Sequence, residues 1–164
     1  MLFVLCAALL ILAAGLRALP YYLAPQGAGV DHWFWKSYVE TYRRERVFPP
    51  GLPQYTLDEH QWYPPLFPLL LAKLPPQIFD RWNHVVAVAL DLARMTVLLG
   101  AGYWQGAGNL RVIAVAGLIY ATIPIQTSYN IQLNPRGLGA LMLEVVLLLL
   151  LWIEALGGSA WLWV

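Results

Sequence analysis

The chain has little charge and a single cysteine. Of its 164 residues, 12% are Asp, Glu, Lys or Arg, about half the usual share, while 60% are hydrophobic. The formal net charge of +1 excludes the strongly basic surface on which nucleic-acid binding depends. The lone Cys6 excludes a disulfide framework and a cluster of thiolate metal ligands. This composition, with 8 Trp and 9 Tyr, is typical of an integral membrane protein.

Four apolar segments have about the length that a bilayer requires. The first, residues 1–19, is predicted to be an uncleaved span, because no basic stretch precedes it and Arg17 to Pro20 is no cleavage site. The others are residues 82–104, which tryptophans bracket, 111–129 and 138–156. The predicted fold class is therefore all-α, a polytopic membrane protein with about four transmembrane helices.

A polar loop follows the first span. Residues 20–62 hold 9 of the 19 charged residues of the chain. Within it, residues 31–46 have the periodicity of a helix with aromatic residues on one face and mixed charge on the other, which predicts an amphipathic juxtamembrane helix lying flat in the interface. The aromatic and aliphatic positions that carry this pattern are Phe34, Trp35, Tyr38, Val39 and Tyr42.

Prolines lead the chain back toward the membrane. Tyr63, Pro64 and Pro65 open the region 63–164 with a rigid turn, since proline removes backbone donors and clashes with a preceding helical turn. A short helix or half-insertion is predicted for residues 66–74, before Pro75 and Pro76 stop it. Because residues 161–164 begin another apolar segment, we expect the chain to be the N-terminal part of a longer protein.

Several ionisable residues are predicted at membrane depth, where charge is costly and marks a bundle interior or a cavity. His84, Asp91 and Arg94 share one face of a helix, and Asp91 can pair with Arg94 at i, i+3 spacing. Glu144 needs a partner, for which Arg94 and Arg136 are the candidates. The group is interpreted either as a structural ion pair or as a site for a lipid phosphate.

Two acidic segments of the loop can carry chemistry. Asp31 can cap the amphipathic helix, or it can ligate a cation or take a proton from an acceptor. The run Asp58, Glu59 and His60 precedes the double proline and is either a solvated loop or a ligand group. Arg136 follows a span end on the same side, where it either clamps a phosphate or snorkels to the interface.

In layout, the chain resembles the N-terminal module of the GT-C superfamily of membrane glycosyltransferases, in particular the protein O-mannosyltransferases and the lipid A aminoarabinose transferases. The resemblance covers roughly residues 1–140. It depends most on the motif of residues 29–32, Gly-Val-Asp-His, and on residues 62–66, Trp-Tyr-Pro-Pro-Leu. His32 stands where the mannosyltransferase branch usually has Glu, and Tyr63 precedes the prolines where that branch typically has His.

The resemblance implies an enzyme that transfers a hexose or pentose from a polyprenyl-phosphate donor to an acceptor at the outer face of the membrane. Asp31 would be the catalytic carboxylate, and His32, Asp58, Glu59 and His60 would lie on the acceptor or metal side, with Mg²⁺ or Mn²⁺ as the implied cation. To these implied roles we add Arg94 and Arg136 as donor-phosphate residues. The implied location is the bacterial inner membrane with the long loop outside, although the basic residues of that loop run against the positive-inside rule.

Two other functions stay open at this point. The chain can be a non-catalytic scaffold or assembly module that works with a partner subunit, or it can be half of a transporter, which the intramembrane Asp91 and Arg94 favour. An inverted repeat of the first spans further along the chain would favour the transporter.

Overall fold

The computed structural model describes residues 1–23, 30–47, 65–123, 133 and 135–155, and these residues form helices and their connections without a strand. The fold is all-α, as the sequence predicts. The helices, in chain order, are α1 (Leu2–Leu23), α2 (Val30–Glu45), α3 (Leu66–Lys73), α4 (Pro76–Gln105), α5 (Leu110–Thr122) and α7 (Pro135–Ala155).

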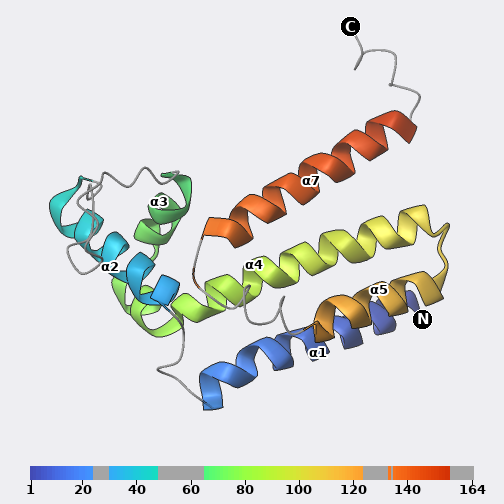
Figure 1. Cartoon of the computed structure of the whole chain (residues 1–164), viewed down its shortest axis with the longest axis horizontal. Helices are drawn as coiled ribbons and strands as arrows, with labels where there is room; N and C mark the ends of the chain where they lie inside the picture. Colours follow the sequence, from blue (N-terminus) through green and yellow to red (C-terminus); the bar gives the residue numbers. More distant parts are fainter. Residues whose placement is uncertain (24–29, 48–64, 124–132, 134, 156–164) are drawn as a thin grey trace, which may run out of the picture.

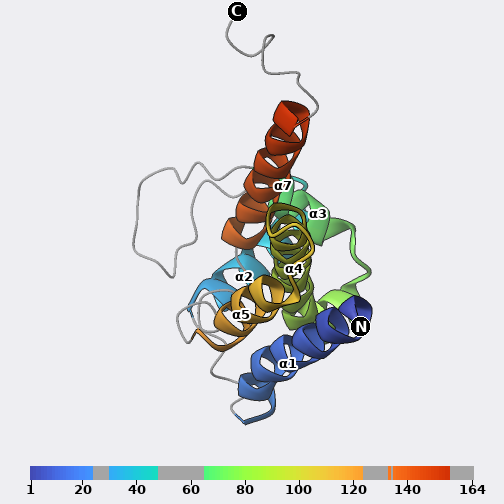
Figure 2. The ribbon, with the colours of Figure 1, turned by 90° about the vertical axis from the view of Figure 1, so that its right-hand side faces the viewer.

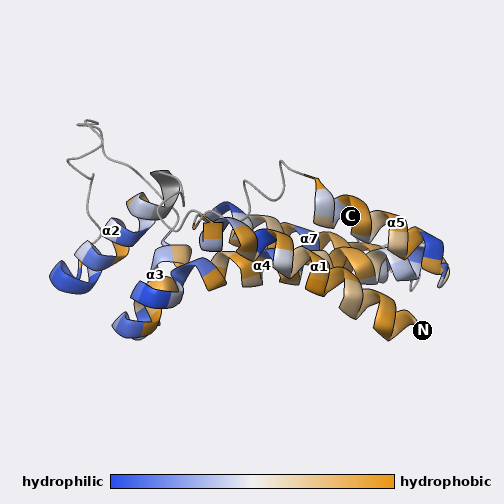
Figure 3. Ribbon diagram, turned by 90° about the horizontal axis from the view of Figure 1, so that it is seen from below, coloured by the Kyte–Doolittle hydropathy of each residue, from blue (hydrophilic) through white to orange (hydrophobic). Residues whose placement is uncertain are grey.

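Three helices, α1, α4 and α7, are long and apolar enough to cross a membrane, and α5 is a shorter apolar helix. The chain is therefore an integral, polytopic membrane protein. Helix α4 lies between α7 on one side and α1 and α5 on the other (Figure 2). Hydrophobic residues dominate these four helices, whereas α2 is largely hydrophilic (Figure 3). The core shared by α1, α4 and α5 consists of Leu9, Ala13, Met95, Leu99, Ile113, Tyr120 and Ala121.

The four apolar helices alternate in direction (Figure 1). The carboxyl end of α1, the amino end of α4, the carboxyl end of α5 and the amino end of α7 therefore lie toward the same end of the bundle. The segment that carries α2 and α3 connects α1 to α4 at that end, which we call the loop end. Tyr103, Trp104 and Arg111 lie at the opposite end, where a tight turn joins α4 to α5.

At the loop end, α2 packs its aromatic face against protein. Phe34, Trp35, Tyr38 and Val39 are all buried, and the Trp35 ring meets Phe67 of α3 edge to face with centroids 5.6 Å apart. The sequence predicts an amphipathic helix lying flat in the interface, and the structure shows that α3 covers its aromatic face. An aromatic face serves either environment, and here α3 covers it. The cluster is completed by Leu71, Phe79 and Leu133.

Arg43 ties the two short helices together. Its guanidinium donates to the backbone oxygens of Leu71 and Ala72, at 3.1 and 3.2 Å, and also to that of Leu74. The oxygen of Leu71 also accepts from the backbone N–H of Leu74 at 3.1 Å. The guanidinium thus adds donors at the carboxyl end of α3, where it complements the negative end of the helix dipole. The guanidinium also lies over the Phe79 ring, 4.8 Å from its centroid.

The predicted helix boundaries agree with the structure to within four residues, except at the start of α4, which lies six residues before the predicted start at 82, and at the end of α5. The amphipathic helix expected at 31–46 is α2, the short helix at 66–74 is α3, and the spans at 82–104 and 138–156 correspond to α4 and α7. The first span continues through Pro20 to Leu23. The span predicted at 111–129 ends as a described helix at Thr122, and its last residues lie outside the described part of the chain.

Candidate functional site

The acidic residues of the first loop are only partly described. Asp31 and His32 lie in the first turn of α2, which begins at Val30, so that the backbone of Asp31 is already helical. Their side chains fall outside the described residues, as do all of Asp58, Glu59, His60, Tyr63 and Pro64. Pro65 directly precedes α3 and is exposed.

The most buried charge in the described chain is the guanidinium of Arg17 in α1. Its side chain is 0% exposed, and its Nε donates to Asp91 of α4, which is 1% exposed. The hydroxyl of Tyr120 in α5 donates to the other carboxylate oxygen of Asp91 at 2.7 Å. Both oxygens of the carboxylate thus have donors, which a charge this deep requires.

Arg17 also donates hydrogen bonds to backbone carbonyls at the carboxyl end of α5. Its Nη1 lies 3.3 Å from the backbone oxygen of Ala121 and its Nη2 lies 3.2 Å from that of Tyr120. In a continuing helix, the oxygen of Tyr120 would accept from the nitrogen at position 124, but that residue is proline and has no N–H to donate. With 13 residues α5 is about 20 Å long, shorter than the hydrocarbon core of a bilayer, so its end lies within the bundle, where an unpaired carbonyl would be costly.

A second ion pair joins α4 to α7. Arg94 donates to Oε1 of Glu144 from Nε at 3.0 Å and from Nη2 at 2.7 Å. This confirms Arg94 as the partner that Glu144 needs. The Oε2 atom of Glu144 is buried and has no hydrogen-bond partner among the described residues. A hollow of about 160 Å³ adjoins Glu144 between the two helices, lined otherwise by Val97, Leu98, Ala101, Leu147, Leu148 and Leu151.

The three polar residues predicted on one face of α4 take partners from three different helices. Asp91 is bonded by α1 and α5, and Arg94 by α7. The ring of His84 lies tilted against that of Tyr21 of α1, with centroids 4.7 Å apart. Two of these residues thus bind charges from neighbouring helices, and the donor-phosphate role proposed for Arg94 has to share the guanidinium with Glu144.

Arg136 lies in the first turn of α7 and is exposed at the loop end. Leu133, just before α7, is fully buried in the cluster that contains the aromatic residues of α2. Helix α2 has Asp31 in its first turn, and helix α7 has Arg136 in its first turn. Both first turns therefore lie at the loop end of the bundle. This is the arrangement that the sequence predicts for the two.

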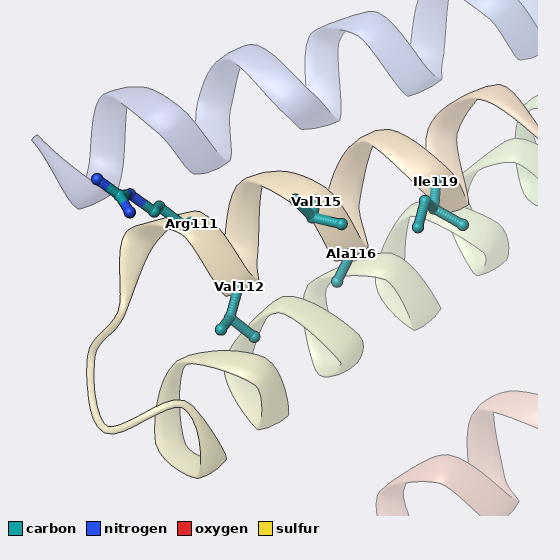
Figure 4. A pocket seen from close by; sticks show the side chains of 5 residues that line it. All are labelled: Arg111, Val112, Val115, Ala116 and Ile119. Atoms are coloured by element: carbon teal, nitrogen blue, oxygen red, sulfur yellow. The ribbon is translucent and has the colours of Figure 1, made fainter.

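In the rest of the described chain, neither potential metal ligands nor a further hollow adds polar groups that converge on one point. Among the described residues, no group of three or more His, Cys, Asp and Glu gathers where it could hold a metal ion, and the predicted acceptor-side ligands 58–60 lie outside that part. A shallow hollow on α5 is lined by Arg111, Val112, Val115, Ala116 and Ile119 (Figure 4). Its walls are apolar apart from Arg111, which suits a surface that faces lipid.

No protein-family model, curated protein sequence or solved structure matches the chain.

Sequence reasoning missed Arg17 and Tyr120 as members of a site. An arginine near the end of a span usually snorkels to the interface, and a tyrosine there is usually a belt residue. Arg17 could have been found in the sequence because a charge inside an apolar helix needs an opposite charge as a partner. It lies 16 residues into an apolar helix of 22, and Asp91 is the acid at comparable depth in the next span.

Proposed function

We propose that this chain forms the acceptor-side membrane module of a GT-C type glycosyltransferase, which transfers a sugar from a polyprenyl-phosphate donor to an acceptor at the outer face of the membrane. The observation that supports this most is the packing of α2 and the start of α7 into one cluster at the loop end, which brings the helix beginning beside Asp31 to the same end as Arg136. The order of elements from α1 through α3 also follows the layout that the resemblance implies.

The proposed reaction uses Asp31 and Arg136. The Asp31 carboxylate accepts the proton of an acceptor hydroxyl, whose oxygen attacks the anomeric carbon of the sugar. The bond from that carbon to the lipid phosphate breaks, and the phosphate leaves with the bonding electron pair. Negative charge then grows on the phosphate, which a guanidinium such as that of Arg136 stabilises.

The test is sugar transfer in membranes by Asp31→Asn, assayed with radiolabelled polyprenyl-phosphate sugars. Loss of a general base lowers rates by about 100-fold or more, and we expect at least this loss with unchanged membrane insertion. Asp80→Asn is the matched control, because Asp80 is another carboxylate at the loop end whose side chain is 55% exposed. Near-normal turnover in the Asp31 variant, or an equal loss in both variants, would contradict the assignment.

A scaffold or assembly module is the second candidate. It is supported by α7, none of whose 21 residues is buried. In that case Asp31→Asn leaves the function unchanged, whereas substitutions on α7 impair assembly with a partner subunit. The transporter alternative depends on Asp91 and Arg94, each of which is bonded to an opposite charge of a neighbouring helix, an arrangement that also fits a structural role.

A further inference from the structure

Two exposed tryptophans on α4 mark where the membrane lies. Trp82 and Trp104 are 49% and 41% exposed and stand twenty-two residues apart, which in an α-helix is about 33 Å. The hydrocarbon core of a bilayer is about 30 Å thick, and tryptophan is enriched at both of its boundaries. Trp82 therefore lies at the loop-side surface of the membrane and Trp104 at the opposite surface.

The lipid-facing side of α4 continues past Trp82. Ile78, Trp82 and Val85 are exposed to 49%, 49% and 43%, and their i, i+4, i+7 spacing puts them on one face of the helix. Ala89, the next residue on this face, is also exposed. One stripe thus runs from the hydrocarbon into the first turns of α4, so that these turns stand in the headgroup layer beside lipid.

An exposed cation lies where this stripe meets the headgroups, and a second one precedes α4 in the chain. Arg81 is exposed, and its guanidinium lies over the Trp82 ring, 5.7 Å from the centroid. Lys73, also exposed, ends α3 only three residues before α4 begins. The acid nearest to Arg81 in the chain, Asp80, has Lys36 of α2 within 3.9 Å, so its charge is partly offset.

We propose that Arg81 and Lys73 bind the phosphate of an anionic phospholipid at the loop-side surface of the membrane. The guanidinium donates to phosphate oxygens while Trp82 anchors the adjoining glycerol and chain region. An anionic headgroup is preferred to a zwitterionic one because it has no ammonium to offset the attraction to the two cations. This site is independent of the proposed sugar transfer.

The test compares lipid retention in native mass spectra of the full chain released from nanodiscs of equal parts phosphatidylglycerol and phosphatidylcholine. We expect the unmodified protein to retain phosphatidylglycerol preferentially. The variant Lys73→Gln/Arg81→Gln loses this preference, about fivefold for each charge removed. The matched control is Arg44→Gln/Arg46→Gln, which removes two exposed cations near the end of α2 and keeps the preference.

Three results would overturn the proposal. The first is an unchanged preference in Lys73→Gln/Arg81→Gln. The second is an equal loss in the α2 control, which would mean that only net charge matters. The third is displacement of the lipid by millimolar inorganic phosphate, which would indicate a site for free phosphate. Thermal unfolding curves of both variants that match the unmodified protein show that the comparison is between folded proteins.

Discussion

Arg17 of α1 donates to Asp91 of α4 across a separation of 74 residues, with both side chains almost completely withdrawn from solvent. The same guanidinium donates hydrogen bonds to the backbone carbonyls of Tyr120 and Ala121 near the end of α5. One side chain therefore links three helices. Because each of its partners is a buried polar group, the contribution of Arg17 exceeds that of a single ion pair.

Replacing Arg17 by methionine is expected to destabilise the bundle strongly. The substitution removes the guanidinium from the buried Asp91 carboxylate, which keeps the Tyr120 hydroxyl as a donor, and breaking one partner of a buried pair costs about 3–5 kcal/mol. The measurement is the free energy of unfolding in mixed micelles, titrated with denaturing detergent. A loss below about 1 kcal/mol would show that the pair is hydrated rather than buried.

The double variant Arg17→Met/Asp91→Leu separates the two functions of Arg17. Removing both charges eliminates the unpaired carboxylate, so most of the lost stability should return. The carbonyls of Tyr120 and Ala121 still lack the Arg17 donor, and the Tyr120 hydroxyl loses its acceptor, so a deficit of about 1–3 kcal/mol should persist. Complete recovery in the double variant would mean that Arg17 has no role in ending α5.

Gly117 allows α5 to approach α1 and α4 closely. A Cβ built there would lie 2.6 Å from Cδ1 of Leu9 and 3.0 Å from Cδ2 of Leu99. Small residues permit such approaches between membrane helices. We expect Gly117→Leu to destabilise the bundle by about 1–3 kcal/mol through overpacking, seen as a lower thermal midpoint.

The matched control for this substitution is Gly100→Leu, on α4. A Cβ at Gly100 meets nothing within 4 Å, and the residue is exposed. Leucine also has a higher helix propensity than glycine, so this variant should be neutral or slightly more stable. Similar thermal midpoints for the two variants would contradict the close packing of α5 at Gly117.

The apolar helices were predictable because a long hydrophobic run in a polytopic chain has few alternatives to a helix. The environment of α2 was not predictable in the same way. Its aromatic positions fit a lipid interface and a protein core equally, and the choice depends on Phe67 and Leu71, which lie in a different segment of the chain. Amphipathic periodicity identifies a face without identifying what covers it.

The polar pairs show the same limit. The charges of α4 were predictable as needing partners, and Glu144 was correctly matched with Arg94. Spacing along one helix suggested Arg94 as a partner for Asp91, but it could not show that the guanidinium of Arg17 in α1 is bonded to that carboxylate. Local spacing is visible in a sequence, but contacts between helices depend on packing. The roles of Asp31 and Arg136 stay predictions.

The position of α7 on α4 can be tested by a disulfide. A Cβ at Gly137 would lie 3.8 Å from the Cβ of Leu90, which equals the mean Cβ separation of disulfides. In a Cys6→Ser background, Leu90→Cys/Gly137→Cys should therefore cross-link almost completely on oxidation, measured as loss of thiol alkylation by mass spectrometry.

Leu90→Cys/Gly139→Cys is the control, since a Cβ at Gly139 meets nothing within 4 Å. No residue of α7 is buried, and the ion pair of Glu144 with Arg94 joins this helix to α4. Equal cross-linking in the two pairs would show that α7 moves freely along α4, and no cross-linking in either would place α7 elsewhere.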